Sequence, residues 1–310
     1  MTSLFGLGVD IRNALYNRGF IRAKKLKGPV ISVGNLSVGG SGKTPFVLLL
    51  GELLKQRDIK FNILSRGYGR RSRGVLLVDP SGPAREFGDE PILMARRLNV
   101  PVIVGEDRYE AGCFAEQEFG PQLHLLDDGF QHRALARDFD IVLVTPEDAR
   151  DRLLPAGRLR EPLSALRRAD AIVLTSGATP ESFPLDSKLI WRARRGIQAK
   201  DVPIRPVVFC GIARPKNFLM QLRIAGIEPA AEAFYRDHHS YTERDVQDLT
   251  KLRVQSEADG FVTTEKDAIN LGEFLPALDS LAIVPVKMEL LDADNAVDTM
   301  LRAIEERRRA

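Results

Sequence analysis

Cysteine, histidine and long apolar runs are scarce in this chain. Of its 310 residues, two are cysteines and four are histidines. Cys113 and Cys210 cannot build a disulfide framework or a cysteine-based zinc site, and so few cysteines fit a reducing compartment. No apolar run approaches the roughly 20 residues of a membrane-spanning helix, and the first 25 residues lack the continuous apolar core of a signal peptide. We therefore expect a cytoplasmic protein.

A strong excess of charge is also lacking. The 45 Lys and Arg residues against 42 Asp and Glu give a net charge of +3, and a hydrophobic content of 44% is ordinary for a globular protein. This mildly basic balance suits an anionic partner. The arginines are scattered and aromatic residues are few, so we expect no nucleic-acid partner. The oligomeric state is not fixed by the sequence, and we take a monomer as the expectation.

Short apolar runs rich in Val, Ile and Leu alternate with amphipathic segments along most of the chain. Runs of this kind are typical of buried parallel strands, so we predict an α/β fold with a doubly wound, mostly parallel sheet. The expected strands cover 30–33, 61–64, 75–78, 100–104, 123–126, 141–144 and 171–174, then 206–209, 260–262 and 281–284. The expected helices cover 46–56, 91–98, 108–118, 215–224 and 243–258. We predict a core at 29–203 and a second, smaller α/β domain at 204–310, whose last helix returns to the core.

A glycine-rich segment directly follows the first apolar strand. It reads Gly34-Asn35-Leu36-Ser37-Val38-Gly39-Gly40-Ser41-Gly42-Lys43-Thr44-Pro45. Backbone N–H groups of Gly39, Gly40, Ser41 and Gly42 can surround a phosphate, Lys43 can reach the β- and γ-phosphates, and Thr44 can bind Mg²⁺. Ser37 stands where the general P-loop pattern has its first glycine. The alternative is a glycine-rich loop with an incidental lysine, but the flanking strand and helix favour a P-loop NTPase-like fold that binds a nucleotide.

Two carboxylates end a later apolar strand, in the segment Leu123-His124-Leu125-Leu126-Asp127-Asp128-Gly129. In P-loop enzymes an Asp at such a position holds Mg²⁺, directly or through water. Asp127 and Asp128 point to opposite sides if the strand continues through them, so we expect one of them to serve the metal. The alternative is an ordinary Asp-Gly turn after a core strand.

Asp89 and Glu90 stand just before a predicted helix, between Gly88 and Pro91. Either carboxylate can simply cap the helix. The functional alternative is a general base or metal-linked carboxylate beside the phosphates, because transfer to a hydroxyl needs a group that accepts its proton.

Two loops combine glycine with arginine, and one of them also carries a tyrosine. Arg66 and Tyr68 lie in Ser65-Arg66-Gly67-Tyr68-Gly69, and Arg160 and Glu161 lie in Gly157-Arg158-Leu159-Arg160-Glu161. Arginine forks bind phosphate and a tyrosine ring packs on a sugar face, although such loops can also be merely solvated.

Two of the histidines are adjacent, at His238 and His239 after Asp237. Manganese phosphoesterases use an Asp-His-His motif, but they need further Asp and His clusters and have no P-loop. Either histidine can pair with a carboxylate and tune a general base, because imidazole titrates near neutral pH. The later Thr263-Thr264-Glu265-Lys266-Asp267 differs in spacing from the guanine-reading motif, which disfavours a GTPase.

Apolar residues recur at near-helical spacing within residues 1–28 and alternate with basic ones. The apolar positions are Leu4, Phe5, Leu7, Ile11, Leu15, Tyr16, Phe20 and Ile21. A basic amphipathic helix of this kind can lie in an anionic membrane interface. The alternative is a helix that packs its apolar face on the rest of the protein.

Taken together, eight motifs in order resemble the tetraacyldisaccharide 4′-kinases, the lipid A kinases of Gram-negative bacteria. To the segments above are added Asp-Asp-Gly-Phe-Gln-His, Phe-Cys-Gly-Ile-Ala-Arg-Pro and Thr-Glu-Lys-Asp-Ala, so the resemblance extends from Gly34 to about Ala268. Ser37 in place of glycine is also a trait of this family. The family often continues with Val-Lys where this chain has Ile269-Asn270, which leaves a role for that basic position unsupported.

The resemblance implies ATP- and Mg²⁺-dependent phosphorylation of the 4′-hydroxyl of a tetraacylated glucosamine disaccharide 1-phosphate. It implies catalytic roles for Lys43, Asp128 and Asp89, the last assisted by His238 or His239, and metal binding by Thr44, Asp127 and Asp128. The segments that it places near the disaccharide contain Arg66, Tyr68, Glu90, Gln131, His132, Arg160 and Glu161. It further implies that the N-terminal helix associates with the membrane, at the cytoplasmic face of the inner membrane. The competing hypothesis from another class is a nucleotide-switched regulatory ATPase.

Overall fold

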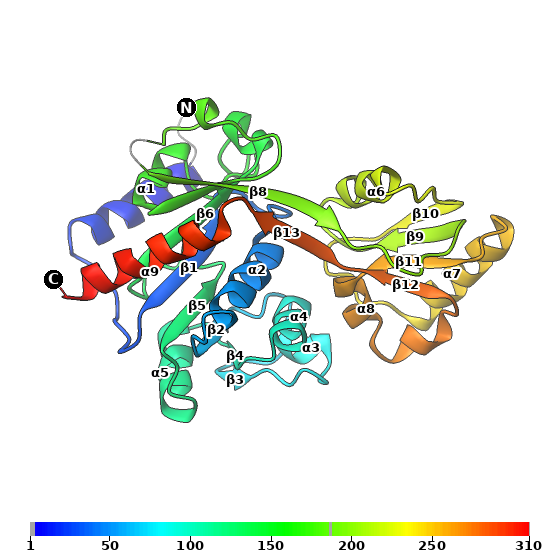
Figure 1. Ribbon diagram of the computed structural model, residues 1–310, viewed down its shortest axis with the longest axis horizontal. Helices are drawn as coiled ribbons and strands as arrows, with labels where there is room; N and C mark the ends of the chain where they lie inside the picture. The colour runs from blue at the N-terminus through cyan, green and yellow to red at the C-terminus, as the bar shows by residue number, and fades with distance from the viewer. Residues whose placement is uncertain (1–3, 186–187, 310) are drawn as a thin grey trace.

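The computed structural model describes residues 4–185 and 188–309, which form one mostly parallel and one parallel sheet with helices on their faces (Figure 1). The larger sheet has nine strands in the order β13-β8-β7-β6-β1-β5-β2-β4-β3, and only its two outermost strands run antiparallel to their neighbours. Its strands are β1 (Val30–Asn35), β2 (Phe61–Ser65), β3 (Leu76–Leu77), β4 (Val102–Val104), β5 (Leu123–Asp127), β6 (Phe139–Val144), β7 (Ala171–Leu174), β8 (Leu189–Ile197) and β13 (Val286–Leu290).

Helices cover both faces of the larger sheet because side chains alternate along each strand. Ile31 of β1 packs in one core with side chains of α2, α4 and α9, whereas Val30 packs on the other face with Ala111 of α5. The helices are α1 (Leu4–Asn17), α2 (Lys43–Lys55), α3 (Ala84–Phe87), α4 (Asp89–Leu98), α5 (Arg108–Glu118) and α9 (Ala293–Arg309), with 3₁₀ helices at Pro146–Arg150, Leu163–Arg168 and Pro180–Ser182. None of the described helices is long and apolar enough to cross a membrane.

The smaller sheet is formed by residues 206–284, which we call the small-sheet unit; the rest of the described chain is the large-sheet unit. Its four parallel strands follow the order β10-β9-β11-β12. Phe209 packs on one face against Leu249 of α7, and Val208 packs on the other against Phe218 of α6. The elements are β9 (Pro206–Cys210), α6 (Pro215–Ile224), β10 (Ala231–Phe234), α7 (Glu243–Gln255), β11 (Gly260–Thr264), α8 (Glu265–Leu271), a 3₁₀ helix (Gly272–Ala277) and β12 (Leu281–Val284).

Two strands of the larger sheet lead into and out of the small-sheet unit. β8 pairs in parallel with β7 through its first residues and antiparallel with β13 through its last ones, where Ile197 faces Val286. In Figure 1 these two strands run side by side between the sheets. After β13 the chain returns to the larger sheet, where Val297 and Met300 of α9 are fully buried.

The predicted α/β class and the mostly parallel sheet are confirmed, and each predicted strand coincides with an observed one within a few residues. The structure adds β8, β10 and β13, the last two only four and five residues long. β8 was missed because its charged residues hide the strand pattern: it alternates buried Trp191 and Ala193 with exposed arginines.

Two predicted segments differ from the structure. The N-terminal helix, predicted within residues 1–28, ends at Asn17, where Gly19 adopts a left-handed φ of 74° and the N–H groups of Phe20 and Ile21 both donate to the Leu15 carbonyl. Residues 1–3 of that prediction lie outside the described chain. The predicted helix at 243–258 ends at Gln255, before Glu257 with its φ of 52°.

Candidate active site

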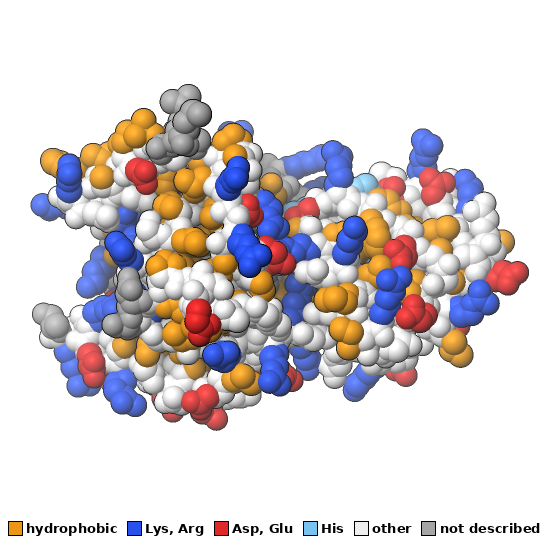
Figure 2. All heavy atoms as spheres, turned by 90° about the horizontal axis from the view of Figure 1, so that it is seen from above, with side chains coloured by type: hydrophobic (Ala, Val, Ile, Leu, Met, Phe, Trp, Pro, Cys, Tyr) orange, Lys and Arg blue, Asp and Glu red, His pale blue; other side chains and the backbone are white. Residues whose placement is uncertain are grey.

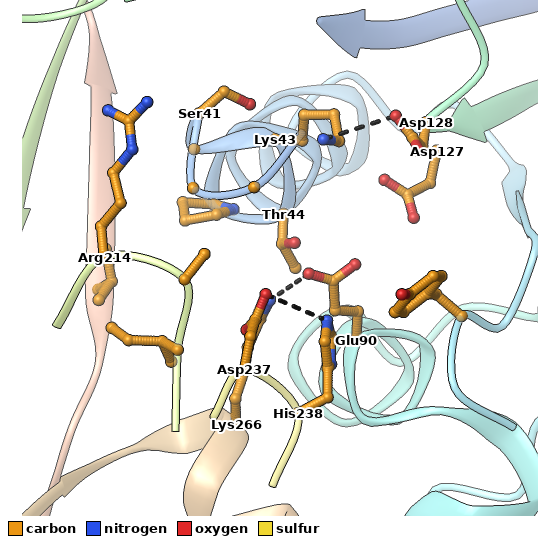
Figure 3. Close-up of a pocket in the computed structure, with 18 of the residues that line it drawn as sticks. Ser41, Lys43, Thr44, Glu90, Asp127, Asp128, Arg214, Asp237, His238 and Lys266 are labelled. Atoms are coloured by element: carbon orange, nitrogen blue, oxygen red, sulfur yellow. Dashed lines mark hydrogen bonds and ion pairs between the residues drawn. The ribbon is translucent and has the colours of Figure 1, made fainter. Parts of the chain in front are cut away.

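A cavity of about 630 Å³ lies where the carboxyl ends of the two sheets face each other (Figure 3). The large-sheet unit contributes the segments after β1, β2 and β5, and the small-sheet unit those after β9, β10 and β11. The carboxyl end of a parallel sheet is where ligands bind in open α/β folds. The predicted P-loop, Asp127, Asp128 and His238 all line this one cavity.

The P-loop glycines have the backbone angles that a phosphate-binding turn requires. Gly39, Gly40 and Gly42 have φ values of 75°, 56° and 88°, which disfavour any side chain. Lys43 begins α2, and its Nζ donates to Asn35 Oδ1 at 3.0 Å and lies 3.5 Å from Asp128 Oδ1. Ser37 does not have a positive φ, so its position does not require glycine; the residue is fully buried and forms an antiparallel bridge with Leu159.

Asp127 and Asp128 both reach the cavity because the strand ends between them. β5 stops at Asp127, and Asp128 takes a left-handed φ of 49°, so the strand does not continue through both residues and the condition for their pointing to opposite sides is not met. Asp127 accepts from the Ser65 hydroxyl at 3.0 Å. Asp128 accepts from both terminal nitrogens of Arg160, at 2.9 and 2.8 Å. Although burial opposes it, the charges of Lys43 and Arg160 hold the pKa of Asp128 well below its usual value.

The polar atoms around Thr44 suit a hydrated divalent cation. Asp127 Oδ1 is buried without a hydrogen-bond partner among the described residues, and so is the Ser41 hydroxyl. Burial and the neighbouring charges of Glu90 and Asp128 raise the pKa of Asp127 to about 7, so a cation bound beside these carboxylates would favour the ionised form of Asp127. Within the described chain no three His, Cys, Asp or Glu side chains form a ready-made metal cage. The donors therefore fit Mg²⁺ that keeps waters and phosphate oxygens as its other ligands.

Asp89 and His238 form a pair that joins the two units. Asp89 is the first residue of α4 and is 3% exposed; Nδ1 of His238 lies 2.9 and 2.8 Å from its two carboxylate oxygens, and Asn270 donates to it at 3.0 Å. His238 itself, with a left-handed φ of 57°, lines the cavity. Burial lowers the pKa of His238, but the hydrogen bond and charge of Asp89 outweigh it and raise the pKa above its ordinary value.

Glu90 meets Lys266 at the same junction between the units. Lys266 donates to the Glu90 carboxylate, and both side chains line the cavity (Figure 3). Burial opposes the charge, yet Glu90 and Asp89 together raise the pKa of Lys266, so the lysine stays protonated. Neither acid is the N-cap of α4, because Gly88 occupies that position, although the Asp89 carboxylate accepts from the N–H of Glu90 at 2.8 Å.

A second cavity of about 300 Å³ adjoins the first, and Arg66, Asp128 and Arg160 line both. Arg108, Gln131 and His132 complete its walls together with Glu106. Burial and the nearby charge of Arg108 lower the pKa of His132 to about 4, which keeps its ring neutral at pH 7. This cavity combines arginine charges with neutral hydrogen-bonding groups, which suits an anionic, hydroxyl-rich molecule.

The structure does not bring every predicted site residue to a cavity. His239 stacks on Tyr235 and its Nε2 lies 3.1 Å from Asp245 Oδ2, outside the lining of either cavity. Glu161 is fully buried, where Asn13 and Arg168 donate to it at 2.8 and 3.0 Å. Tyr68 lines the main cavity, and its ring centroid lies 5.2 Å from that of His238.

Sequence reasoning missed Arg108, Lys266 and Asn270. The sequence places Arg108 on a predicted helix with no sign of a function, and Lys266 lies in the family motif Thr-Glu-Lys-Asp-Ala without a role assigned to it. Asn270 stands at one of the two positions that depart from the family pattern, yet it donates to Asp89. The short distances in sequence between Thr264, Lys266 and Asn270, at a strand-to-helix junction, are the signal that could have singled them out.

Comparisons with known proteins agree with this geometry. The sequence model of the tetraacyldisaccharide-1-P 4′-kinase family matches residues 1–305. A tetraacyldisaccharide 4′-kinase of Koribacter versatilis is 52% identical over 99% of this chain and 98% of its own length, and one of Aquifex aeolicus is 42% identical over 85% of both. A crystal structure of LpxK from Aquifex aeolicus in complex with ATP superposes with a TM-score of 0.80, at 37% identity over 98% of this chain and 96% of that one.

The match covers both sheets, the P-loop and the segments that carry Asp89 and His238. The chain belongs to the tetraacyldisaccharide-1-phosphate 4′-kinase family.

Proposed function

We propose that this chain transfers the γ-phosphoryl group of ATP to the 4′-hydroxyl of a tetraacylated glucosamine disaccharide 1-phosphate. One observation supports this most: a carboxylate–histidine pair, Asp89 and His238, stands at the same cavity as the P-loop. A nucleotide-binding module alone needs the P-loop, whereas phosphoryl transfer to an alcohol also needs a group that takes the hydroxyl proton.

ATP is held by the P-loop, with Lys43 at the β- and γ-phosphates. Asn35 and Asp128 fix the Lys43 ammonium before the nucleotide arrives. The residues that would hold Mg²⁺ are Thr44, Asp127 and Asp128. When bound, this ion neutralises charge on the β- and γ-phosphate oxygens.

His238 accepts the proton of the attacking hydroxyl, and Asp89 orients it. His238 lines the cavity whereas Asp89 does not, so the histidine stands between the carboxylate and the acceptor. With Nδ1–H donated to Asp89, the free electron pair is on Nε2, which lies 3.8 Å from Asp237. The buried carboxylate stabilises the imidazolium that forms, as in other histidine–carboxylate pairs. This assigns the base function to His238 rather than to Asp89, and it leaves His239 without a catalytic role.

The disaccharide head group occupies the second cavity. Arg66 and Arg108 supply charge for an anionic sugar, and Gln131 and His132 supply hydrogen bonds to its hydroxyl groups. Because Arg66, Asp128 and Arg160 line both cavities, an acceptor bound there lies next to the γ-phosphate position.

The N-terminal helix α1 places the enzyme on the cytoplasmic face of the inner membrane as a peripheral protein. Phe5, Leu7, Ile11 and Leu15 on α1 are at least 37% exposed, and Phe20 just after it is 73% exposed. In Figure 2 patches of apolar side chains lie beside basic ones at the left of the view, on the large-sheet unit. An apolar face with flanking Lys and Arg is the pattern of an interfacial helix.

The test incubates the protein with ATP, Mg²⁺ and the disaccharide 1-phosphate and locates any new phosphate by NMR. The proposal requires ATP consumption that depends on the glycolipid and a new phosphate at the 4′ position. ATP hydrolysis at the same rate without the acceptor, with no phosphorylated lipid, would instead support a regulatory ATPase.

A further inference from the structure

Two arginines that line the main cavity have buried nitrogens without hydrogen-bond partners and too few carboxylates nearby to neutralise their charge. Arg214, just before α6, is 14% exposed; its Nη1 donates to Glu147 Oε2 at 3.2 Å, but Nε and Nη2 are buried without a hydrogen-bond partner in the described chain. The Nε of Arg195 on β8 is also buried without a hydrogen-bond partner, and no described carboxylate lies within ion-pair distance of this side chain. Both side chains line the cavity that holds the P-loop.

The two guanidinium groups also repel each other. Burial lowers the pKa of Arg195, and the nearby charge of Arg214 lowers it further. A buried cation without a counterion is unfavourable, and two neighbouring ones are more so. In the space-filling view, Lys and Arg side chains gather along the junction of the two units (Figure 2). Such an arrangement requires an anion in the bound state.

Arg214 packs directly against the glycines of the P-loop. A Cβ on Gly40 would lie 2.7 Å from Arg214 Cγ, and one on Gly39 would lie 3.1 Å from the Cβ of Ala213. Figure 3 shows Arg214 on the side of the P-loop opposite to Asp127 and Asp128. The arginine therefore lies beside the glycine backbone, which in P-loops surrounds the α- and β-phosphates, and away from the γ-phosphate side marked by Lys43 and Asp128.

We propose that Arg195 and Arg214 bind the α- and β-phosphates of the nucleotide, so that the small-sheet unit and its connecting strand complete the phosphate site from the side opposite the acceptor. This rests on the proposed use of ATP. The anion of the acceptor is excluded as the occupant, because the acceptor cavity is lined by Arg66 and Arg108 and contains neither Arg195 nor Arg214. Arginine forks match phosphate oxygens in geometry as well as in charge.

The experiment measures the affinity for ADP and for the β,γ-methylene analogue of ATP by calorimetry, with Mg²⁺ and without acceptor. We expect Arg214→Gln and Arg195→Gln to weaken both ligands by about tenfold or more and by similar factors, as for the loss of a charge-assisted hydrogen bond. Arg214→Lys, which keeps the charge but not the fork, should lose less. Arg194→Gln is the matched control, since this exposed arginine points to the opposite face of β8.

Glu147→Gln separates ligand binding from a structural role of the ion pair. If Arg214 contacts phosphate, removing its carboxylate partner leaves the affinity unchanged or higher. The proposal is overturned if Glu147→Gln loses as much affinity as Arg214→Gln. It is also overturned if neither arginine variant loses affinity while its thermal unfolding matches the wild type, or if the variants weaken binding of the ATP analogue but not of ADP. A wild-type protein that binds both nucleotides but phosphorylates no glycolipid would refute the proposed function and leave this assignment standing.

Discussion

At the scale of single residues, the site depends on side chains held in unusual backbone conformations. Asp128 and His238 both have positive φ values, of 49° and 57°, and each faces the main cavity. A left-handed conformation costs a non-glycine residue roughly 1 kcal/mol, so the surrounding contacts must hold it. Arg160 and Lys43 hold Asp128, and Asp89 holds His238. The charged groups that shift the pKa values of Asp128 and His238 therefore also hold these two side chains in position.

The pH dependence of turnover tests the pairing of Asp89 with His238. As a base, His238 must be deprotonated, so kcat/KM should rise as the pH passes through the pKa of His238. Burial and the charge of Lys266 lower this pKa, but the hydrogen bond and charge of Asp89 raise it by more, and Asp237 raises it slightly. Asp89→Asn removes the charge of Asp89, so this rise should move to lower pH. The maximal rate should fall by about 10² to 10⁴-fold, with ATP binding retained. pH profiles of kcat/KM for both proteins measure the shift.

His239→Gln serves as the control, because that ring pairs with Asp245 and should leave the profile in place. An unmoved rise in Asp89→Asn would contradict the pairing. The pairing of Asp89 with His238 also makes stability depend on pH. Because the pKa of His238 is raised in the folded state, the contribution of the pair to the free energy of unfolding is complete below about pH 6.5 and is lost as the pH rises through the raised pKa.

At the scale of elements, α1 has two faces with different surroundings. Val9 is buried, and Asn13 donates to Glu161, so one face packs on the protein. The other face leaves Leu7 and Ile11 about half exposed. Both interpretations of this helix from the sequence, a packed helix and an interfacial one, are therefore compatible with its geometry, and the proposed membrane contact would use the exposed face.

Replacing Leu7, Ile11 and Leu15 with Ser should release the protein from anionic vesicles. Each removed side chain takes away roughly 1 to 2 kcal/mol of apolar burial in the interface. Co-sedimentation with vesicles measures the bound fraction. The matched control replaces Ile204, Ile224 and Val254, which are at least 74% exposed on or next to the small-sheet unit. The role of α1 would be refuted if the folded Leu7, Ile11 and Leu15 variant still bound the vesicles. It would also be refuted if the control variant lost binding to the same extent.

Elements with a strong local pattern were the predictable ones. The buried strand β1, the glycine turn and α2 follow each other along the sequence, so the strand, turn and helix of the P-loop could all be predicted from local pattern. The pairing of Asp89 with His238 rather than with His239 was not predictable, because Asp89 and His238 are 149 residues apart in the sequence. The same holds for Lys266, whose partner Glu90 is 176 residues away. Motif resemblance indicated which segments matter, but side-chain pairing across the cavity needed the structure.

At the scale of the whole molecule, polar contacts hold the two units together around the cavity. Lys266 pairs with Glu90, Asn270 with Asp89, and Arg97 with Glu265. These contacts connect α4 of the large-sheet unit to α8 of the small-sheet unit. The predicted division into a P-loop core and a smaller domain after residue 203 stays a prediction, although β13 and α9 lie with the larger sheet.

Lys266→Met should destabilise the protein by about 2 kcal/mol or more and should reduce phosphoryl transfer, because it leaves the Glu90 carboxylate without its counterion between the units. Urea unfolding measures the free energy. Lys251→Met is the control: its ion pair with Asp248 at 3.2 Å is exposed, with side chains 69% and 56% accessible, and should contribute less than about 1 kcal/mol. Equal effects of the two substitutions would show that the Lys266 contact does not hold the units together.

The antiparallel pairing of β8 with β13 has a consequence for how the chain is assembled. Ile197 faces Val286, so the points where the chain leaves and rejoins the larger sheet are neighbours. Residues 198–285 are thus an insertion into the tip of a β-hairpin, and a short turn in their place would leave every strand of the larger sheet with its partner. An excised protein of this kind would keep Lys43 and Asp89 but lose His238. On the roles proposed above, it would hold a nucleotide through the P-loop without Arg214 and would have no base for phosphoryl transfer.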